Sequence, residues 1–168
     1  MNMGKQFKGM VACFSLGSNL GNRTLNLNTA MRLMSERMGR VEKVSRVFES
    51  PSWGYSSDNH YFNCCTILRT EHRPLTLLDI ALELEKEMGR NRRAGGYEDR
   101  IIDIDFLLYD GMIIDHPRLK LPHPKMNERR FVLLPLAEIA PRWIHPLSGR
   151  NMVELLKECP DPSEVSPV

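Results

Sequence analysis

The feature that most constrains this chain is the run Asp99–Leu108, in which carboxylates interrupt a series of β-branched and apolar side chains. Such a run favours a strand, and side chains alternate along a strand, so Asp103 and Asp105 share one face while the apolar residues share the other. Two residues of rise separate the two aspartates by roughly 6.6 Å at their Cα atoms. That spacing lets their oxygens bind one or two hard cations such as Mg²⁺. The sequence therefore predicts a metal site on one face of this strand.

An isolated pair of aspartates has a simpler explanation, namely a polar strand face turned to solvent, because antiparallel strands often alternate in this way. The residues just upstream favour the metal site instead. Four arginines surround a short glycine-containing loop there: Arg90, Arg92, Arg93 and Arg100. Such a cluster suits a polyphosphate held between metal ions and guanidinium groups. We expect residues 91–99 to be mobile when the site is empty and to close over a bound polyphosphate.

Length and charge narrow the remaining classes. A chain of 168 residues, 42% of them apolar, can form a core without disulfide bridges, and we expect one domain over residues 1–168 with frayed ends at 1–9 and 160–168. The cysteines form no CxxC pair and are typical of buried thiols in a reducing cytosol: Cys13, Cys64, Cys65 and Cys159. The net charge of +2 gives no argument for nucleic acid, and no run approaches a membrane span. These features predict a cytoplasmic protein.

Hydrophobic periodicity and turn residues predict the succession of strands and helices. Strands are expected over 10–16, 41–50, 61–70 and through the two aspartates, and helices over 25–38, 74–88, 128–140 and 152–159. Asp110-Gly111 predicts a hairpin that pairs the aspartate strand with Met112–Ile114. The aromatic residues of the loop 51–60 indicate a binding loop. This order favours an α+β domain with helices packed on a mainly antiparallel sheet.

Three motifs follow one another along the chain: Leu16–Asn22 (LGSNLGN), Asp99–Asp105 (DRIIDID), and Leu121–Pro124 (LPHP) continued by Glu128–Pro141. Together, over residues 10–158, they resemble the 6-hydroxymethyl-7,8-dihydropterin pyrophosphokinase family of folate biosynthesis. The resemblance implies a ferredoxin-like α/β/α sandwich. It also implies an ATP-dependent diphosphokinase that transfers pyrophosphate from ATP to the hydroxymethyl group of the pterin, giving AMP and the pterin diphosphate.

The resemblance further implies roles for individual residues. Asp103 and Asp105 would hold two Mg²⁺ ions, in agreement with the argument from strand alternation. The residues that would contact ATP are Glu85, Arg90, Arg100, Phe106, Arg118, His123 and Arg129. The residues that would act in catalysis are Arg92, Arg93, Arg100 and Asp105. The residues that would bind the pterin are Ser50, Trp53, Tyr61, Asn63 and Phe131. Of these, Tyr61 and Phe131 would stack on the ring, and Asn63 would form hydrogen bonds with its edge.

Simpler explanations remain open for several of these residues. Glu85 has the pattern of a residue on a helix surface, and His123 that of a turn residue between two prolines. Tyr61 and Phe131 are equally typical of ordinary core aromatics.

The segment before the aspartates departs from the family pattern. The family often has Arg-Trp-Gly-Pro-Arg where this chain has Gly96–Arg100 (GYEDR). A cation is therefore missing at position 96, and Tyr97 replaces a tryptophan. Pro124 also replaces a tyrosine that frequently contacts phosphate, which puts the strength of nucleotide binding in doubt.

Two other classes of protein remain as alternatives. A nucleic-acid-binding ferredoxin-like module without catalysis would explain the arginines, but an aspartate pair repels phosphate unless a metal intervenes. A non-catalytic interaction domain would tolerate loss of that pair. Only the kinase requires metal-dependent nucleotide binding. We therefore expect a monomeric enzyme whose partners are the small molecules ATP and 6-hydroxymethyl-7,8-dihydropterin, with no nucleic acid and no membrane.

Overall fold

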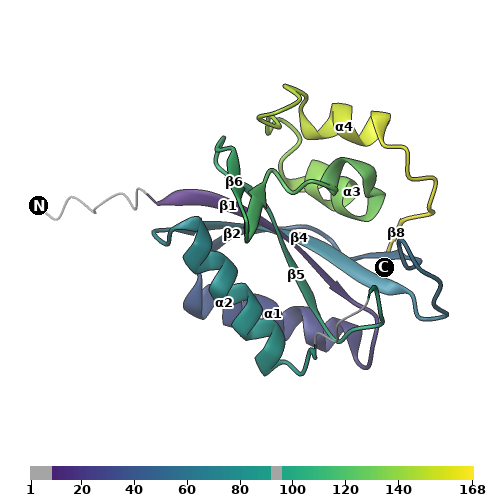
Figure 1. Cartoon of the computed structure of the whole chain (residues 1–168). Helices are drawn as coiled ribbons and strands as arrows, with labels where there is room; N and C mark the ends of the chain where they lie inside the picture. Colours follow the sequence, from purple (N-terminus) through teal and green to yellow (C-terminus); the bar gives the residue numbers. More distant parts are fainter. Residues whose placement is uncertain (1–8, 92–95) are drawn as a thin grey trace, which may run out of the picture.

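An antiparallel sheet forms the middle layer of the computed structural model, which describes residues 9–91 and 96–168 (Figure 1). Its strands run in the order β5-β1-β4-β3-β8, and β2 also pairs with β4. Their bounds are β1 Met10–Ser18, β2 Arg40–Val44, β3 Phe48–Ser50, β4 Tyr61–Thr70, β5 Asp103–Tyr109 and β8 Ser166–Pro167. The expected strand over 61–70 is confirmed, and β1 lies between the aspartate strand β5 and β4.

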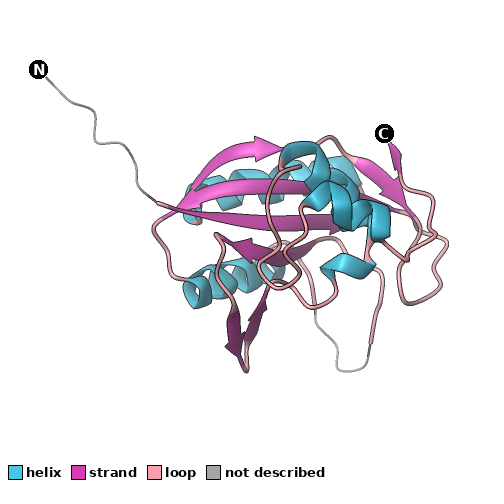
Figure 2. Cartoon of the chain, turned by 90° about the horizontal axis from the view of Figure 1, so that it is seen from above, coloured by secondary structure: helices cyan, strands magenta, loops and turns pink. Residues whose placement is uncertain are grey.

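Helices cover both faces of this sheet (Figures 1 and 2). The helices α1 (Arg23–Arg37) and α2 (Pro74–Glu87) lie on one side, and α3 (Arg130–Ile139) and α4 (Met152–Glu158) on the other. A short 3₁₀ helix, Met126–Glu128, precedes α3. The expected α+β sandwich of helices on a mainly antiparallel sheet is thereby confirmed. None of the helices described is long and apolar enough to cross a membrane.

Alternation along β1 supplies both hydrophobic cores. Ala12, Phe14 and Leu16 belong to the core under α1 and α2, whereas Cys13 belongs to the core under α3 and α4. The four cysteines are free and buried, as expected. The same alternation continues beyond the apolar residues, so that the α3 side of the sheet turns polar toward the end of β1, where Ser15 and Gly17 follow Cys13.

The turn after α2 places an arginine beside β5. Gly89 adopts a left-handed backbone conformation (φ 95°), which a residue with a side chain rarely adopts. The N–H of the following Arg90 donates to the carbonyl of Glu85 at 2.9 Å. The helix therefore ends with Arg90 folded back toward its own last turn.

Two sequence expectations about strands are wrong. The strand β6 (Ile114–His116) pairs with β7 (Leu119–Leu121) and not with β5. Asp110 is bonded to β1 instead: its N–H donates to Val11 O at 2.7 Å, and its Oδ1 accepts from Val11 N at 3.0 Å. The expected single strand over 41–50 is split into β2 and β3.

The C-terminal segment is ordered against the sheet, contrary to the expected frayed end at 160–168. Pro167 pairs with Phe48, and the buried Asp161 accepts a hydrogen bond from the N–H of Arg130 at 3.0 Å. This bond also holds the start of α3. Residues 1–8 of the expected frayed N-terminus lie outside the described residues.

Candidate active site

The pocket that contains the two aspartates lies on the α3 side of the sheet, at the end of β1. Gly17 of β1 is paired with Asn63 of β4 on one side and with Asp103 of β5 on the other. Two residues earlier along β1, Ser15 is paired with Asp105. Because side chains alternate along a strand, these residues face the same side of the sheet as Gly17 and Asp103. The residues lining the pocket are Ser15, Gly17, Ser50, Pro51, Trp53, Tyr55, Tyr61, Asn63, Tyr97, Arg100, Asp103, Asp105, Arg129 and Phe131.

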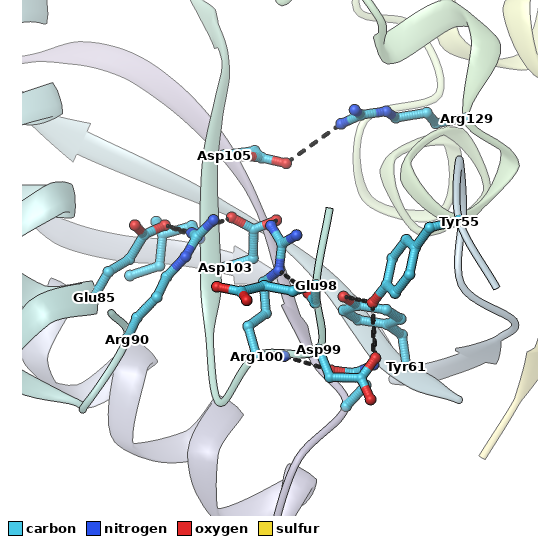
Figure 3. A network of polar contacts seen from close by, with 12 residues as sticks. Tyr55, Tyr61, Glu85, Arg90, Glu98, Asp99, Arg100, Asp103, Asp105 and Arg129 are labelled. Carbon is cyan, nitrogen blue, oxygen red and sulfur yellow. Dashed lines mark hydrogen bonds and ion pairs between the residues drawn. The ribbon is translucent and has the colours of Figure 1, made fainter. Parts of the chain in front are cut away.

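Three arginines neutralise the two aspartates (Figure 3). Asp103 accepts from Arg90 Nη1 at 2.6 Å and from Arg100 Nη1 at 3.1 Å. Asp105 Oδ2 lies 3.5 Å from Arg129 Nη1. Loss of hydration, and to a lesser extent repulsion from Asp103, raises the pKa of Asp105 above its usual range, although the attraction of Arg129 acts in the opposite direction. The two carboxylates therefore disfavour each other's charge, which a divalent cation would reverse.

The donor set fits a metal ion that arrives with part of its own ligand shell. No group of three or more His, Cys, Asp or Glu side chains suited to a metal occurs within residues 9–91 and 96–168. Two carboxylates supply only part of the octahedral oxygen shell of Mg²⁺. The remaining ligands would have to be water and substrate oxygens, which is the usual arrangement for magnesium bound with a phosphate ester.

Glu85 holds both Arg90 and β5 in place. Its side chain is 2% exposed, so the simpler explanation of Glu85 as a residue on a helix surface is wrong. The Oε1 atom accepts from Arg90 Nη1 at 2.6 Å and from the backbone N–H of Ile104 at 2.8 Å. Because Ile104 stands between the two aspartates, Glu85 fixes the strand at the point from which both carboxylates project.

The other half of the pocket is aromatic. All five residues expected to bind the pterin line it, and Tyr61 and Phe131 are half-buried rather than fully enclosed in the core. Asn63 is buried and its Nδ2 donates to Ser50 Oγ at 2.9 Å. A Cβ atom on Gly17 would lie 3.1 Å from Asn63 Oδ1, so a larger residue there would push into the asparagine. The aromatic rings and the buried amide that line this half suit a planar heterocycle.

Arg129 joins the aromatic half to the carboxylates. Its guanidinium lies over the Trp53 ring at 4.7 Å and over the Phe131 ring at 5.8 Å. The residue is 8% exposed, and its Nε is buried without a hydrogen-bond partner in the described structure. A buried donor without a partner is unfavourable, and an acceptor such as a phosphate oxygen would satisfy it.

Several predicted residues lie elsewhere. Phe106 is a core residue that stacks on Phe14 at 4.5 Å, and Arg118 lies at the β6–β7 turn, paired with Asp79 of α2. Neither lines the pocket. The residues Arg92 and Arg93, and with them the expected closing of their loop, lie outside the described residues.

His123 lies in the turn before the 3₁₀ helix, outside the lining of the pocket. Its backbone N–H donates to Leu107 O at 2.9 Å, and its Nδ1 accepts from Lys125 N at 3.1 Å. Burial, and then the charge of Arg129, lower the pKa of His123 from its ordinary value of 6.5 to about 4. The imidazole is therefore neutral at pH 7.

This lowered pKa predicts how stability depends on pH. Below pH 6.5, His123 becomes protonated in the unfolded chain but stays neutral in the folded protein. The contribution of the neutral His123 to stability is therefore lost as the pH falls toward 4. Between pH 7 and pH 4.5, the free energy of unfolding should fall by about 2 kcal/mol less in His123→Gln than in the unmodified chain. Urea titrations at several pH values measure this difference. Parallel curves for the two proteins would contradict the buried, neutral histidine.

Sequence reasoning missed a group of polar and aromatic contacts at the mouth of the pocket. The Tyr55 and Tyr97 rings are stacked, with centroids 6.2 Å apart, and Lys125 Nζ donates to Tyr97 OH at 2.9 Å. Asp99 and Asn19 are hydrogen-bonded to each other at 2.8 Å. The aromatic content of the loop 51–60 was the available signal, but the identity of the partners depends on contacts between distant segments.

Comparisons with known proteins agree with this geometry. Residues 13–141 match the family model described as 7,8-dihydro-6-hydroxymethylpterin-pyrophosphokinase. A 2-amino-4-hydroxy-6-hydroxymethyldihydropteridine pyrophosphokinase of Porphyromonas gingivalis is 41% identical over 139 residues, covering 81% of this chain and 94% of the relative. The protein of the same name from Aquifex aeolicus is 37% identical, covering 85% of this chain and 88% of the relative.

Solved structures agree in fold. A crystal structure of HPPK-DHPS in complex with substrates superposes with a TM-score of 0.75 at 15% identity, covering 89% of this chain and 43% of the other. A Plasmodium falciparum HPPK-DHPS superposes with a TM-score of 0.73 at 17% identity, covering 92% of this chain and 46% of the other. The chain thus spans less than half the length of these two solved proteins, and at this identity the likeness concerns the fold alone.

Proposed function

The chain belongs to the 7,8-dihydro-6-hydroxymethylpterin-pyrophosphokinase family and is an ATP-dependent diphosphokinase of folate biosynthesis, and from this premise we propose how its residues divide the reaction. The reaction transfers pyrophosphate from ATP to the hydroxymethyl group of 6-hydroxymethyl-7,8-dihydropterin. The hydroxymethyl oxygen loses its proton and bonds to the β-phosphorus, the bond from that phosphorus to the α-phosphate oxygen breaks, and AMP leaves. One observation carries the proposal: a single pocket joins an aromatic wall to a pair of carboxylates surrounded by arginines.

The aromatic half would bind the pterin. Tyr61 and Phe131 offer ring faces for stacking, and Trp53 and Ser50 complete the wall. The Asn63 amide, whose orientation is fixed by its bond to Ser50, would bond the polar edge of the heterocycle. Because β1 places Gly17 between Asn63 and Asp103, a pterin in this position would present its substituent toward the carboxylates.

The carboxylate half would bind the phosphates. Asp103 and Asp105 would hold two Mg²⁺ ions, which when bound supply charge neutralisation and orientation of the phosphate oxygens. Arg90, Arg100 and Arg129 would then turn from the aspartates to phosphate oxygens, where guanidinium groups stabilise the charge of the transferring group. Glu85 would act by holding Arg90 and the backbone of β5, and neutral His123 would serve as a hydrogen-bonding group beside the nucleotide.

We further propose that the enzyme works as a monomer in the cytoplasm on these two small molecules. The buried free cysteines suit a reducing compartment. The alternative of a nucleic-acid-binding module has less support, because the arginines around the pocket already face carboxylates rather than forming an open basic surface.

Replacing Phe131 tests the pterin site. Phe131→Ala should weaken pterin binding by about 1–3 kcal/mol, because a stacked ring and its buried area are lost, and should leave the affinity for a non-hydrolysable ATP analogue unchanged. Calorimetry with each ligand, beside an assay of AMP release, measures both effects. Phe62→Ala is the matched control, since Phe62 packs against the core on the α1 side of β4. Equal losses for both ligands in Phe131→Ala would identify this residue as part of the core instead.

A further inference from the structure

The carboxylate of Asp99 lies where two segments of the pocket wall meet (Figure 3). One segment is the loop 51–60, and the other, residues 96–101, carries Arg100. Oδ1 of Asp99 accepts from Tyr55 OH at 3.0 Å and from Asn19 Nδ2 at 2.8 Å. Oδ2 accepts from Asn59 Nδ2 at 2.6 Å. One carboxylate therefore joins both segments to the residue that follows β1.

These bonds are formed by the ionised carboxylate. Burial alone would raise the pKa of Asp99, but hydrogen bonds from Ser57, Asn59, Asn19 and Tyr55 lower it to about 2. Hydrogen bonds to a charged acceptor are shorter and about twice as strong as those between neutral groups. This junction, which consists of Asp99 and its partners Tyr55, Asn59 and Asn19, is thus charged and fully formed throughout the range of neutral pH.

The junction continues into both halves of the pocket. On the pterin side, the Tyr55 hydroxyl that bonds Asp99 also lies 2.7 Å from the Tyr61 hydroxyl. On the phosphate side, Asn19 Oδ1 accepts from Arg100 N at 2.7 Å, and Asn19 N donates to Arg100 O at 3.1 Å. Arg100 in turn reaches Asp103. A short chain of contacts therefore links a proposed pterin-stacking ring to a proposed phosphate-binding arginine.

We propose that Asp99 is a positioning residue for the transfer: by holding Tyr55, Asn59 and Asn19 it fixes the loop 51–60 relative to Arg100. The pterin and the phosphates are then presented to one another in a constant relation. This inference rests on the proposed pterin site.

Substitutions at Asp99 test this role. Asp99→Ala should raise the dissociation constant of the pterin about tenfold and lower kcat about tenfold, because charge-assisted hydrogen bonds are lost on the pterin side. The affinity for an ATP analogue should change less than about twofold. Asp58→Asn is the control, since Asp58 is an exposed carboxylate in the same loop. Tyr55→Phe removes only the hydroxyl and should give a smaller change of the same kind, which keeps the test open if Asp99→Ala fails to fold.

An exchange of partners separates positioning from general stability. Asp99→Asn replaces the charged acceptor of the Asn59 amide by a second amide, and Asn59→Asp places a second carboxylate beside that of Asp99. The first change weakens the hydrogen bond and the second makes the two groups repel each other, so each change alone should weaken pterin binding. The double variant restores the bond with donor and acceptor reversed, and should bring kcat and the pterin dissociation constant to within about threefold of the unmodified enzyme. Loss that is simply additive in the double variant would overturn the positioning role.

The outcome can be separated from a failure of the pterin site itself. If Trp53→Ala and Tyr61→Ala leave pterin affinity unchanged, the proposed site is wrong. If those variants weaken pterin binding while the Asp99 variants keep normal kcat and pterin affinity, the site stands and the role of Asp99 is overturned.

Discussion

Asp103→Ala and Asp105→Ala are each expected to lower kcat by about a thousandfold or more while the protein stays folded. On the proposed assignment, each change would remove a hard oxygen ligand of magnesium from β5, and charge stabilisation of the transferring group would depend on those ions. Both side chains face the pocket rather than a core, so their loss opens no cavity in the hydrophobic cores. The assay is release of AMP from ATP in the presence of the hydroxymethyl-dihydropterin, at limiting and at saturating Mg²⁺.

Asp115→Ala is the matched control for these variants. Asp115 lies on β6, is exposed, and pairs with Lys120 away from the pocket. Its loss should leave turnover and magnesium dependence unchanged. Near-normal activity of either aspartate variant at limiting Mg²⁺ would show that the metal assignment is wrong.

Glu85→Ala is expected to lower the free energy of unfolding by about 3–4 kcal/mol. The change leaves Arg90, whose side chain is 12% exposed, without one of its carboxylate partners, and leaves the Ile104 N–H buried without an acceptor. Breaking a buried ion pair from one side costs about 3–5 kcal/mol where the remaining charge is uncompensated, and the expected loss lies at the lower end of this range because Arg90 keeps Asp103. Urea unfolding measures the change.

Two further variants sharpen this result. Glu83→Ala, at an exposed position on the same helix, should change stability by less than about 0.5 kcal/mol. Glu85→Gln retains an acceptor for the Ile104 N–H and should fall between the two alanine variants. Equal stabilities for Glu85→Ala and Glu83→Ala would refute the bracing of β5 by this helix.

Local patterns predicted the parts of the site that depend on neighbours in sequence. The shared face of Asp103 and Asp105 follows from strand alternation alone, and the structure places both in one pocket. Glu85 was harder to interpret because its decisive partner, the N–H of Ile104, is 19 residues away. The same limit explains the wrong hairpin at Asp110, whose partner Val11 is 99 residues away.

The mouth of the pocket shows this limit most clearly. The resemblance indicated the pterin-binding residues, and all of them line the pocket, but it gave no partner for Asp99 because the usual motif differs there. Its contacts to Tyr55 and Asn19 span 44 and 80 residues and arise only when β1, the loop 51–60 and the segment before β5 come together. Arg92 and Arg93 stay predictions.

If the substrates bind as proposed, the ion pairs between arginines and aspartates make substrate binding an exchange of partners. A magnesium ion entering alone would have to displace Arg90 and Arg100 from Asp103, leaving Arg90 paired with Glu85 alone and Arg100 without this carboxylate. A nucleotide entering alone would draw the same arginines away and leave the aspartates exposed to its own negative charge. On the proposed assignment, when ion and nucleotide enter together each of the two aspartates would gain a metal ion and each of the three arginines would gain a phosphate oxygen. The pairing would therefore favour the complex of metal and nucleotide over either component.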